Sequence, residues 1–331
     1  MQAFKIDTTM RFLLWSVAVI ALFIADLCLG SVSLMPGEVV SALLGRSDAS
    51  TAKIVADLRL TRAVTALTAG AALSVSGLQM QTLFRNPLAG PYVLGISSGA
   101  SLGVALLMLW LPTGALAGVW GEWSVAAGAW IGAAAVLVIV GAVTRRVRDI
   151  MVVLVVGMML SSGISAVVQI MQYLGSEASL KNFVVWTMGA LGDVTRSQLW
   201  IFVPAVVAGL ILAIASVKSL NLLLFGEEYA VSMGLRIKQS RTMLFISTTL
   251  LAGSVTAFCG PIGFLGLAMP HVARGAFSTS DSRVLVPASM ISGSAALLLC
   301  DIFSKQFALP VNAMTALLGI PIIIWIVLKK R

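Results

Sequence analysis

Long apolar runs recur along the chain and are separated by short polar stretches. A helix needs about 20 mostly apolar residues to cross the hydrocarbon core of a bilayer. Nine segments meet or nearly meet this length: about 12–30, 63–82, 93–112, 123–143, 150–172, 199–217, 242–259, 285–303 and 311–328. The pattern therefore predicts an all-α, polytopic membrane protein.

A tenth apolar segment, GPIGFLGLAMPHVAR at residues 260–274, is short and interrupted by Gly and Pro. The basic residues decide whether it crosses, because cytoplasmic loops carry an excess of Lys and Arg. If it crosses and the N-terminus is inside, most of the 22 basic residues are cytoplasmic. With nine spans, Lys329, Lys330 and Arg331 would lie outside. We therefore predict ten spans with both termini in the cytoplasm.

Two connecting stretches look unlike simple loops. Residues 175–198 contain FVVWTMGAL, which is too short to span and predicts a half-helix on the outer side. Residues 219–240 form the longest cytoplasmic loop, and their composition predicts short helices outside the bilayer. The whole chain, 1–331, then forms a single transmembrane domain.

The composition excludes a soluble domain of any size. Of the 331 residues, 59% are hydrophobic and 11% are charged, with a mean hydropathy of +1.02, whereas soluble domains average roughly 25% charged residues. The three cysteines lie in apolar runs without CxxC spacing, so neither a disulfide framework nor a metal site is indicated. The net charge of +9 reflects membrane topology, and we expect no nucleic-acid partner.

The stretch GISSGAS, residues 95–101, matches the G-x-S-x-G pattern of serine hydrolases. That motif needs a strand, a tight turn and a helix in an α/β sheet, a context that a membrane span does not offer. An intramembrane serine protease using Ser97 or Ser98 with His271 as base is a remote alternative. We favour helix packing, because Gly95, Gly99 and Gly103 recur every four residues and let two helices approach closely.

Two further features point to a passage through the membrane. FRNPLAGP, residues 84–91, cannot continue a helix, so its backbone must face protein or a water-filled cavity. The second feature is a polar stripe on one face of the fifth apolar segment. Its members are Ser162, Ser165, Gln169 and Gln172. Such a stripe can line water or bond a neighbouring helix.

Four blocks, in order, cover nearly the whole chain: residues 59–103 (RLTRAVTALTAGAALSVSGLQMQTLFRNPLAGPYVLGISSGASLG), 225–237 (FGEEYAVSMGLRI), 260–302 (starting GPIGFLGLAMPHVARGAF) and 309–330 (LPVNAMTALLGIPIIIWIVLKK). They resemble the permease subunits of ATP-binding-cassette importers for iron–siderophores, haem and cobalamin. The resemblance implies ten helices, a homodimer with the pathway at its interface, two cytoplasmic ATPase subunits and an extracytoplasmic binding protein. It also implies the bacterial inner membrane.

The same resemblance implies that ATP and Mg bind the partner ATPase and that this chain needs no cofactor. In agreement, the sequence contains no G-x-x-x-x-G-K-[ST] phosphate loop.

The resemblance also assigns roles to matching positions. Arg59 and Arg62 match basic residues that dock the binding protein, and Lys305 matches a third, where Lys replaces Arg and lacks its bidentate fork. Asn86, Pro87 and Leu88 match the inner gate, and the polar stripe matches a helix along the pathway. The positions that match the ATPase-coupling helices are Glu227, Glu228, Ala230 and Gly234.

Three questions stay open at this stage. His271 matches a histidine common to permeases for unlike substrates, so we expect local packing or hydrogen bonding rather than haem ligation. An ion-coupled secondary transporter is the main alternative, but it usually needs acids deep in the membrane. Here Asp26 and Asp301 lie near the outer ends of their spans, and Asp193 and Glu122 lie in outer loops. The identity of the chelate remains undetermined.

Overall fold

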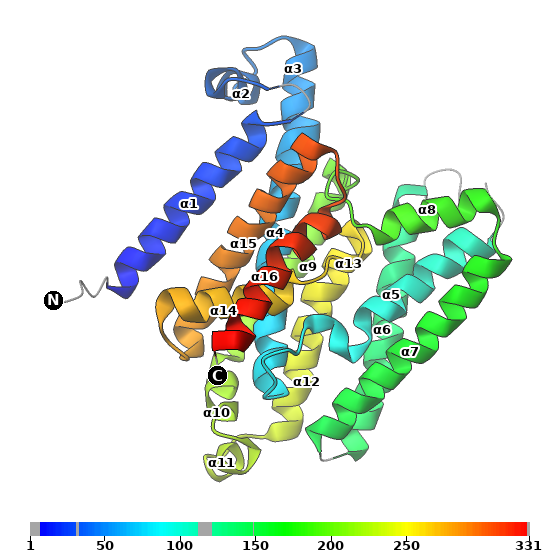
Figure 1. Ribbon diagram of the computed structural model, residues 1–331, viewed down its shortest axis with the longest axis vertical. Helices are drawn as coiled ribbons and strands as arrows, with labels where there is room; N and C mark the ends of the chain where they lie inside the picture. The colour runs from blue at the N-terminus through cyan, green and yellow to red at the C-terminus, as the bar shows by residue number, and fades with distance from the viewer. Residues whose placement is uncertain (1–6, 31–32, 112–120, 148, 330–331) are drawn as a thin grey trace.

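The computed structural model describes residues 7–30, 33–111, 121–147 and 149–329 (Figure 1). Every regular element among them is helical, which confirms the all-α prediction. The predicted cytoplasmic ends, with Lys5, Lys330 and Arg331, lie outside the described residues. The elements are α1 (Thr8–Cys28), α2 (Pro36–Leu43), α3 (Ala49–Lys53), η1 (Ile54–Arg59), α4 (Leu60–Leu83), η2 (Pro91–Leu94), α5 (Ile96–Ala105), η3 (Leu106–Trp110), α6 (Gly121–Arg146), α7 (Ile150–Leu174), α8 (Glu177–Thr187), α9 (Arg196–Ala215), α10 (Val217–Leu223), α11 (Glu227–Ser232), α12 (Ile237–Thr248), η4 (Thr249–Gly253), α13 (Ser254–Cys259), α14 (Leu265–Phe277), α15 (Ser282–Phe307) and α16 (Val311–Lys329).

Seven helical segments of the described chain are long and apolar enough to cross a membrane, judged by length and composition. They are Thr8–Cys28, Ala49–Leu83, Trp123–Thr144, Ile150–Leu174, Arg196–Ala215, Ile237–Cys259 and Ser282–Phe307. The protein is therefore a multi-span membrane protein, as the sequence predicts. The other three predicted crossings correspond to shorter helices: Ile96–Trp110, Val311–Ile326 and α14. The count of ten crossings stays a prediction.

Two of the short helices are short because Gly and Pro precede them. The segment 84–90 contains no regular helix and delays α5, and the stretch Gly260–Phe264 delays α14 in the same way. Gly260 has a φ of +72°, and a Cβ there would lie 2.4 Å from the Trp186 carbonyl oxygen. Only glycine fits this turn.

The second span begins earlier than the apolar run 63–82 indicates. One continuous helix of 35 residues covers Ala49–Leu83, so Arg59 and Arg62 lie on a helix. Asp48 caps its start by accepting a hydrogen bond from the Thr51 N–H at 3.1 Å. Hydrogen bonds from Ser50 and from the Thr51 backbone lower the pKa of Asp48 to about 2. Residues 49–62 contain no Gly or Pro, so they can stay helical although they are less hydrophobic than residues 63–82.

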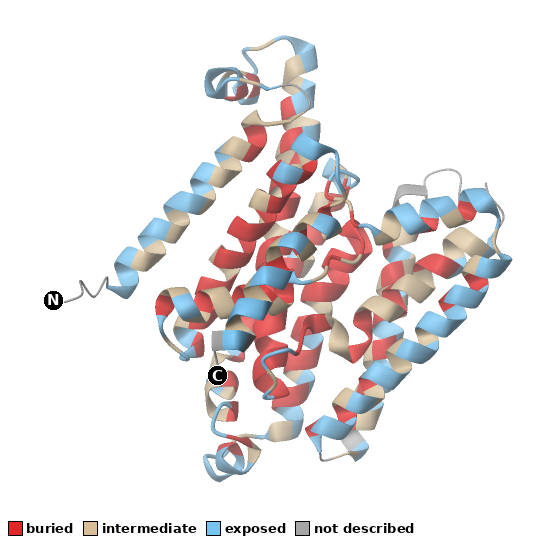
Figure 2. Cartoon of the chain, viewed as in Figure 1, coloured by how far each residue is buried: buried red, intermediate tan, exposed pale blue. Residues whose placement is uncertain are grey.

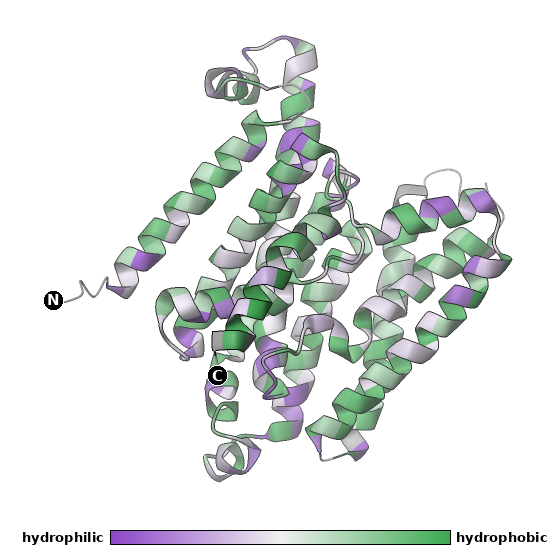
Figure 3. Ribbon diagram, viewed as in Figure 1, coloured by the Kyte–Doolittle hydropathy of each residue, from purple (hydrophilic) through white to green (hydrophobic). Residues whose placement is uncertain are grey.

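This long helix forms the centre of the molecule (Figure 2). In its most apolar 18-residue stretch 83% of the residues are buried inside the protein, against 11% for the corresponding stretch of Thr8–Cys28 and 17% for that of Ile150–Leu174. α15 and α14 pack along α4, and α5 packs on α6. Many exposed side chains of α1 and α7 are apolar, which suits contact with lipid or another apolar surface, and Figure 3 shows both helices as mainly hydrophobic.

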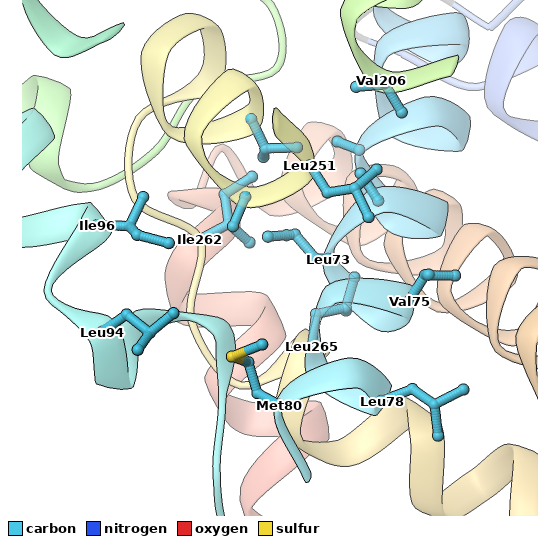
Figure 4. Close-up of a cluster of buried hydrophobic side chains, with 14 of the residues drawn as sticks. Leu73, Val75, Leu78, Met80, Leu94, Ile96, Val206, Leu251, Ile262 and Leu265 are labelled. Carbon is cyan, nitrogen blue, oxygen red and sulfur yellow. The ribbon is translucent and has the colours of Figure 1, made fainter. Parts of the chain in front are cut away.

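Backbones approach closely around α4. A Cβ at Gly77 would lie 1.6 Å from the Gly266 carbonyl oxygen, and one at Gly70 would lie 2.3 Å from that of Gly293. Buried apolar side chains pack around these contacts. Figure 4 shows Leu73 and Met80 of α4 in the same cluster as Leu251 and Leu265. Small residues thus set the helix spacing here, as in other membrane bundles.

The buried Gln79 of α4 is paired with a neighbouring helix. Gln79 donates from Nε2 to Ser247 Oγ at 2.9 Å and accepts from Thr248 Oγ1 at 2.9 Å. These bonds join α4 to α12 in the interior, where an unpaired amide would be costly.

Candidate functional site

The predicted inner-gate residues form a compact turn between α4 and η2. Asn86 Oδ1 accepts a hydrogen bond from the Leu88 N–H at 2.9 Å, which closes an Asx turn. Pro87 has no N–H, but its carbonyl oxygen lies 2.8 Å from His271 Nε2. Leu88 is half exposed. The turn is therefore held to α14 on one side and presents an apolar side chain on the other.

His271 anchors this turn through one defined tautomer. A carbonyl oxygen only accepts hydrogen bonds, so His271 Nε2 carries the proton that it donates to Pro87. Its Nδ1 lies 3.5 Å from Arg274 Nη1, which also donates to Gln81 Oε1 at 2.8 Å. The expectation of a local hydrogen-bonding role agrees with this geometry. His271 does not line the cavity that contains Ser97 and Ser98.

That cavity lies between α5, α7 and α8 and has a volume of about 280 Å³. It contains three members of the predicted polar stripe, Ser165, Gln169 and Gln172. The fourth member, Ser162, lies outside it and donates to the Met158 carbonyl oxygen at 3.1 Å. Four hydroxyl residues that we did not assign to the pathway also line the cavity: Ser97, Ser98, Ser101 and Thr187. The first three belong to GISSGAS, a stretch that we interpreted only as a packing surface.

The glycines of that stretch do contact another helix. A Cβ at Gly99 would lie 2.5 Å from the Gly132 carbonyl oxygen, and one at Gly103 would lie 1.9 Å from that of Gly128. Gly95 differs because it precedes α5 with a φ of +80°. Because Gly95 has no side chain, it can adopt the left-handed backbone conformation of this turn and also allow neighbouring helices to pack closely.

Charged side chains gather near the C-terminal ends of α1 and α15 and the N-terminal end of α4. Lys305 Nζ lies 2.8 Å from Asp26 Oδ1 and 2.9 Å from Asp301 Oδ2. Arg62 donates from Nε to both carboxylate oxygens of Asp301, at 2.8 and 3.0 Å. Both aspartates are fully buried. We call Asp26, Arg62, Asp301 and Lys305 the buried charge cluster.

The three predicted docking residues are thus engaged within the chain. Arg59 is buried and donates to the carbonyl oxygens of Leu27 and Cys28, each at 2.9 Å. Lys305 also donates to the Asp26 carbonyl oxygen at 3.2 Å, and its side chain is 7% exposed. Arg62 has the most accessible side chain of the buried charge cluster, at 26%. Docking by these residues stays a prediction.

The predicted coupling residues lie at the opposite end of the molecule, on and beside α11 (Figure 1). Glu227 forms a bidentate ion pair with the buried Arg241 of α12, with Nη2–oxygen distances of 2.6 and 2.7 Å. Glu228 is exposed and Ala230 is buried. Gly234 has a φ of +84°, a backbone conformation that favours glycine.

The preceding helix, α10, is attached to α15. Asn221 donates to Asp281 Oδ1 at 2.6 Å and accepts from the Ser282 N–H at 2.7 Å. The Arg283 N–H and the Asn221 amide lower the pKa of Asp281. The α10–α11 segment therefore has separate polar connections to α12 and to α15.

No group of three or more His, Cys, Asp or Glu residues in the described part of the chain could hold a metal ion. The chain combines helices long enough to cross a membrane with a turn at Asn86–Leu88, a polar cavity between α5, α7 and α8, and charged side chains at both ends. Residues 18–329 match the model of the FecCD transport family. The chain belongs to that family.

Relatives with assigned roles agree with this membership. The chain is 34% identical over 280 residues to the hemin transport system permease protein HmuU of Yersinia pestis, with 83% of each chain covered. It is 36% identical over 310 residues to the vitamin B12 import system permease protein BtuC of Klebsiella pneumoniae, covering 92% of this chain and 89% of the relative.

A solved inward-facing conformation of a transporter assigned to the metal-chelate ABC type has the same fold. Its TM-score is 0.84 at 24% sequence identity, over 98% of this chain and 100% of the other. At this identity the likeness concerns the fold alone.

Proposed function

We propose that this chain is the permease subunit of an ATP-driven importer that carries a metal chelate across the bacterial inner membrane. The observation that carries the proposal is the family match over residues 18–329, together with relatives whose names assign them to hemin and vitamin B12 transport. Iron–siderophore, haem and cobalamin are the candidate substrates.

In this proposal two copies of the chain enclose the pathway. Two cytoplasmic ATPase subunits bind at α10–α11, and an extracytoplasmic binding protein docks at the other end. Support comes from the structure, where α3 and α11 lie at opposite ends of the molecule (Figure 1). Both chain termini would then be cytoplasmic.

The proposed mechanism is alternating access. Nucleotide-driven movement of the ATPase pair displaces α10–α11, whose bonds to α12 and α15 move those helices with it. α12 is bonded to α4, and α4 leads into the gate turn that His271 holds from α14. Such a change requires that nucleotide and binding protein contact the two states differently.

The test is uptake by the complete complex in proteoliposomes, with its own ATPase and binding protein. Ferric hydroxamate, haem and cobalamin are supplied separately, with and without ATP. We expect ATP-dependent, vanadate-sensitive accumulation of at least one of them. Uptake that instead follows an imposed proton or sodium gradient without ATP would establish the ion-coupled alternative and refute the proposal.

A further inference from the structure

The cavity between α5, α7 and α8 has an unusual lining. Seven polar side chains face it, and all are hydroxyls or amides; Val168 and Phe183 complete it. No lining residue is charged, and none is His, Cys, Asp or Glu. The cavity therefore offers hydrogen-bond donors and acceptors without a fixed charge or a metal ligand.

Most of these polar groups have no partner in the protein. Elsewhere in the described helices, hydroxyls commonly bond to their own backbone: Thr68, Thr82 and Thr144 each donate to the carbonyl oxygen four residues earlier. In the cavity, Thr187 donates to the carbonyl oxygen of Val184, three residues earlier. Within the described residues no protein hydrogen bond forms at the remaining six, Ser97, Ser98, Ser101, Ser165, Gln169 and Gln172.

These six polar side chains are available to a ligand, because Ser165 and Gln169 are exposed and the other four are half-buried. Polar groups without hydrogen bonds are costly in an apolar environment. If these serines served only helix packing, each hydroxyl could bond to a backbone carbonyl of its own helix. The half-buried Ser97, Ser98 and Ser101 of α5 meet Gln169 and Gln172 of α7 across the cavity. Convergent polar groups in a concave site are typical of ligand recognition.

We propose that this cavity is a substrate subsite that binds uncharged hydrogen-bonding groups on the outside of a chelate, such as hydroxyl, amide or hydroxamate groups. This inference rests on the proposed import function and narrows its substrate class. A carboxylate-rich, anionic chelate would find no counter-charge in the lining, and the metal itself would stay with the chelator.

Thiol protection tests the subsite without requiring transport. In a Cys28→Ser background, Ser98→Cys and Ser101→Cys place a thiol in the cavity, and the two remaining cysteines are buried. The reconstituted permease–ATPase complex is labelled with a neutral maleimide, with or without a neutral ferric trihydroxamate, cyanocobalamin, ferric citrate or haem. Ser50→Cys, exposed near the start of α3, is the matched control.

We expect a neutral probe to slow labelling of both cavity thiols by roughly tenfold at ten times its Kd, by mass action. The anionic probes should leave the rate unchanged, and Ser50→Cys should label equally in every condition. Protection by ferric citrate or haem equal to that by the neutral probes, or protection by none of the four, would overturn the proposal.

Transport kinetics give a second measurement. Ser98→Ala and Gln169→Leu should raise the KM for uptake of the neutral chelate by about two- to tenfold, the range for one lost hydrogen bond. Ser292→Ala, whose hydroxyl bonds to Ser289 of its own helix, should leave the KM unchanged. An unaltered KM in both cavity variants contradicts the subsite. If the unmodified complex shows no ATP-dependent uptake, the proposed function fails, while thiol protection still decides the subsite.

Discussion

At the scale of single residues, Lys305 is the clearest case in which sequence position and structural role differ. Its place before the last helix suggests a surface contact. In the structure its ammonium group lies within 3.2 Å of three oxygen atoms, from Asp26 and Asp301. The ammonium group donates to the Asp26 carbonyl oxygen and forms ion pairs with the carboxylates of Asp26 and Asp301. Lys305 therefore acts as the counter-ion of two buried acids.

Lys305→Met should lower the free energy of unfolding by about 3–5 kcal/mol, because it leaves a buried carboxylate unpaired. Adding Asp26→Asn should recover much of this loss, since Arg62 still pairs with Asp301. Thermal unfolding of the purified permease in detergent measures both effects.

Lys181→Met, at an exposed position on α8, is the control, and it should change the free energy by less than about 0.5 kcal/mol. If Lys305→Met unfolds like the unmodified protein yet binds the binding protein less tightly, Lys305 is a docking residue after all.

At the scale of elements, two adjacent glutamates at the start of α11 have different environments. Glu227 faces inward to Arg241, whereas Glu228 is exposed. The match to coupling helices treats the pair alike, because a sequence does not specify which side of a short helix meets the protein. The structure gives Glu227 an internal bond and leaves Glu228 accessible to a partner.

Glu227→Gln should lower the free energy of unfolding by about 1.5–3 kcal/mol, the range for a hydrogen bond to a charged group. Glu228→Gln should leave unfolding unchanged and weaken binding of the ATPase. Thermal unfolding of the permease and co-purification of the ATPase separate the two effects. Loss of ATPase binding by Glu227→Gln with unchanged unfolding would show that Glu227 itself contacts the partner.

Most of the helices could be predicted from the sequence. Apolar run length gives the spans, and the short outer helix α8 and the helices α10 and α11 follow from segments too short or too polar to cross. The beginning of the second span could not be predicted, because residues 49–62 are helical without being strongly apolar. The serines of α5 that line the α5–α7–α8 cavity could not be predicted either. Whether a hydroxyl lacks a partner depends on how the neighbouring helices pack, which the sequence does not specify.

At the scale of the whole molecule, the closest backbone approach discussed above joins α4 to α14. A Cβ at Gly77 would lie 1.6 Å from the Gly266 carbonyl oxygen. Because backbone cannot move aside as a side chain can, Gly77→Ala must push the two helices apart. The turn that holds the proposed gate residues follows α4, and His271 bonds to it from α14, so we expect a change in this contact to reach that turn.

Gly77→Ala should lower the free energy of unfolding by about 1–3 kcal/mol, as overpacking does, and should reduce uptake. Gly275→Ala is the control on α14, where a new Cβ meets nothing within 4 Å; it should be neutral or slightly stabilising. Thermal unfolding and uptake are measured on both variants. Equal unfolding of the two would refute close contact between α4 and α14.

The burial of α4 also has a consequence for how the protein is made. Its span is the least hydropathic of the seven, at 1.3, yet it is the most enclosed. A segment rich in buried Gln, Ser and Thr enters a bilayer only weakly on its own. Its main neighbour, α15, is synthesised near the end of the chain. Stable membrane insertion of α4 should therefore wait for the ribosome to finish, and nascent chains truncated before α15 should expose it to cytoplasmic proteases.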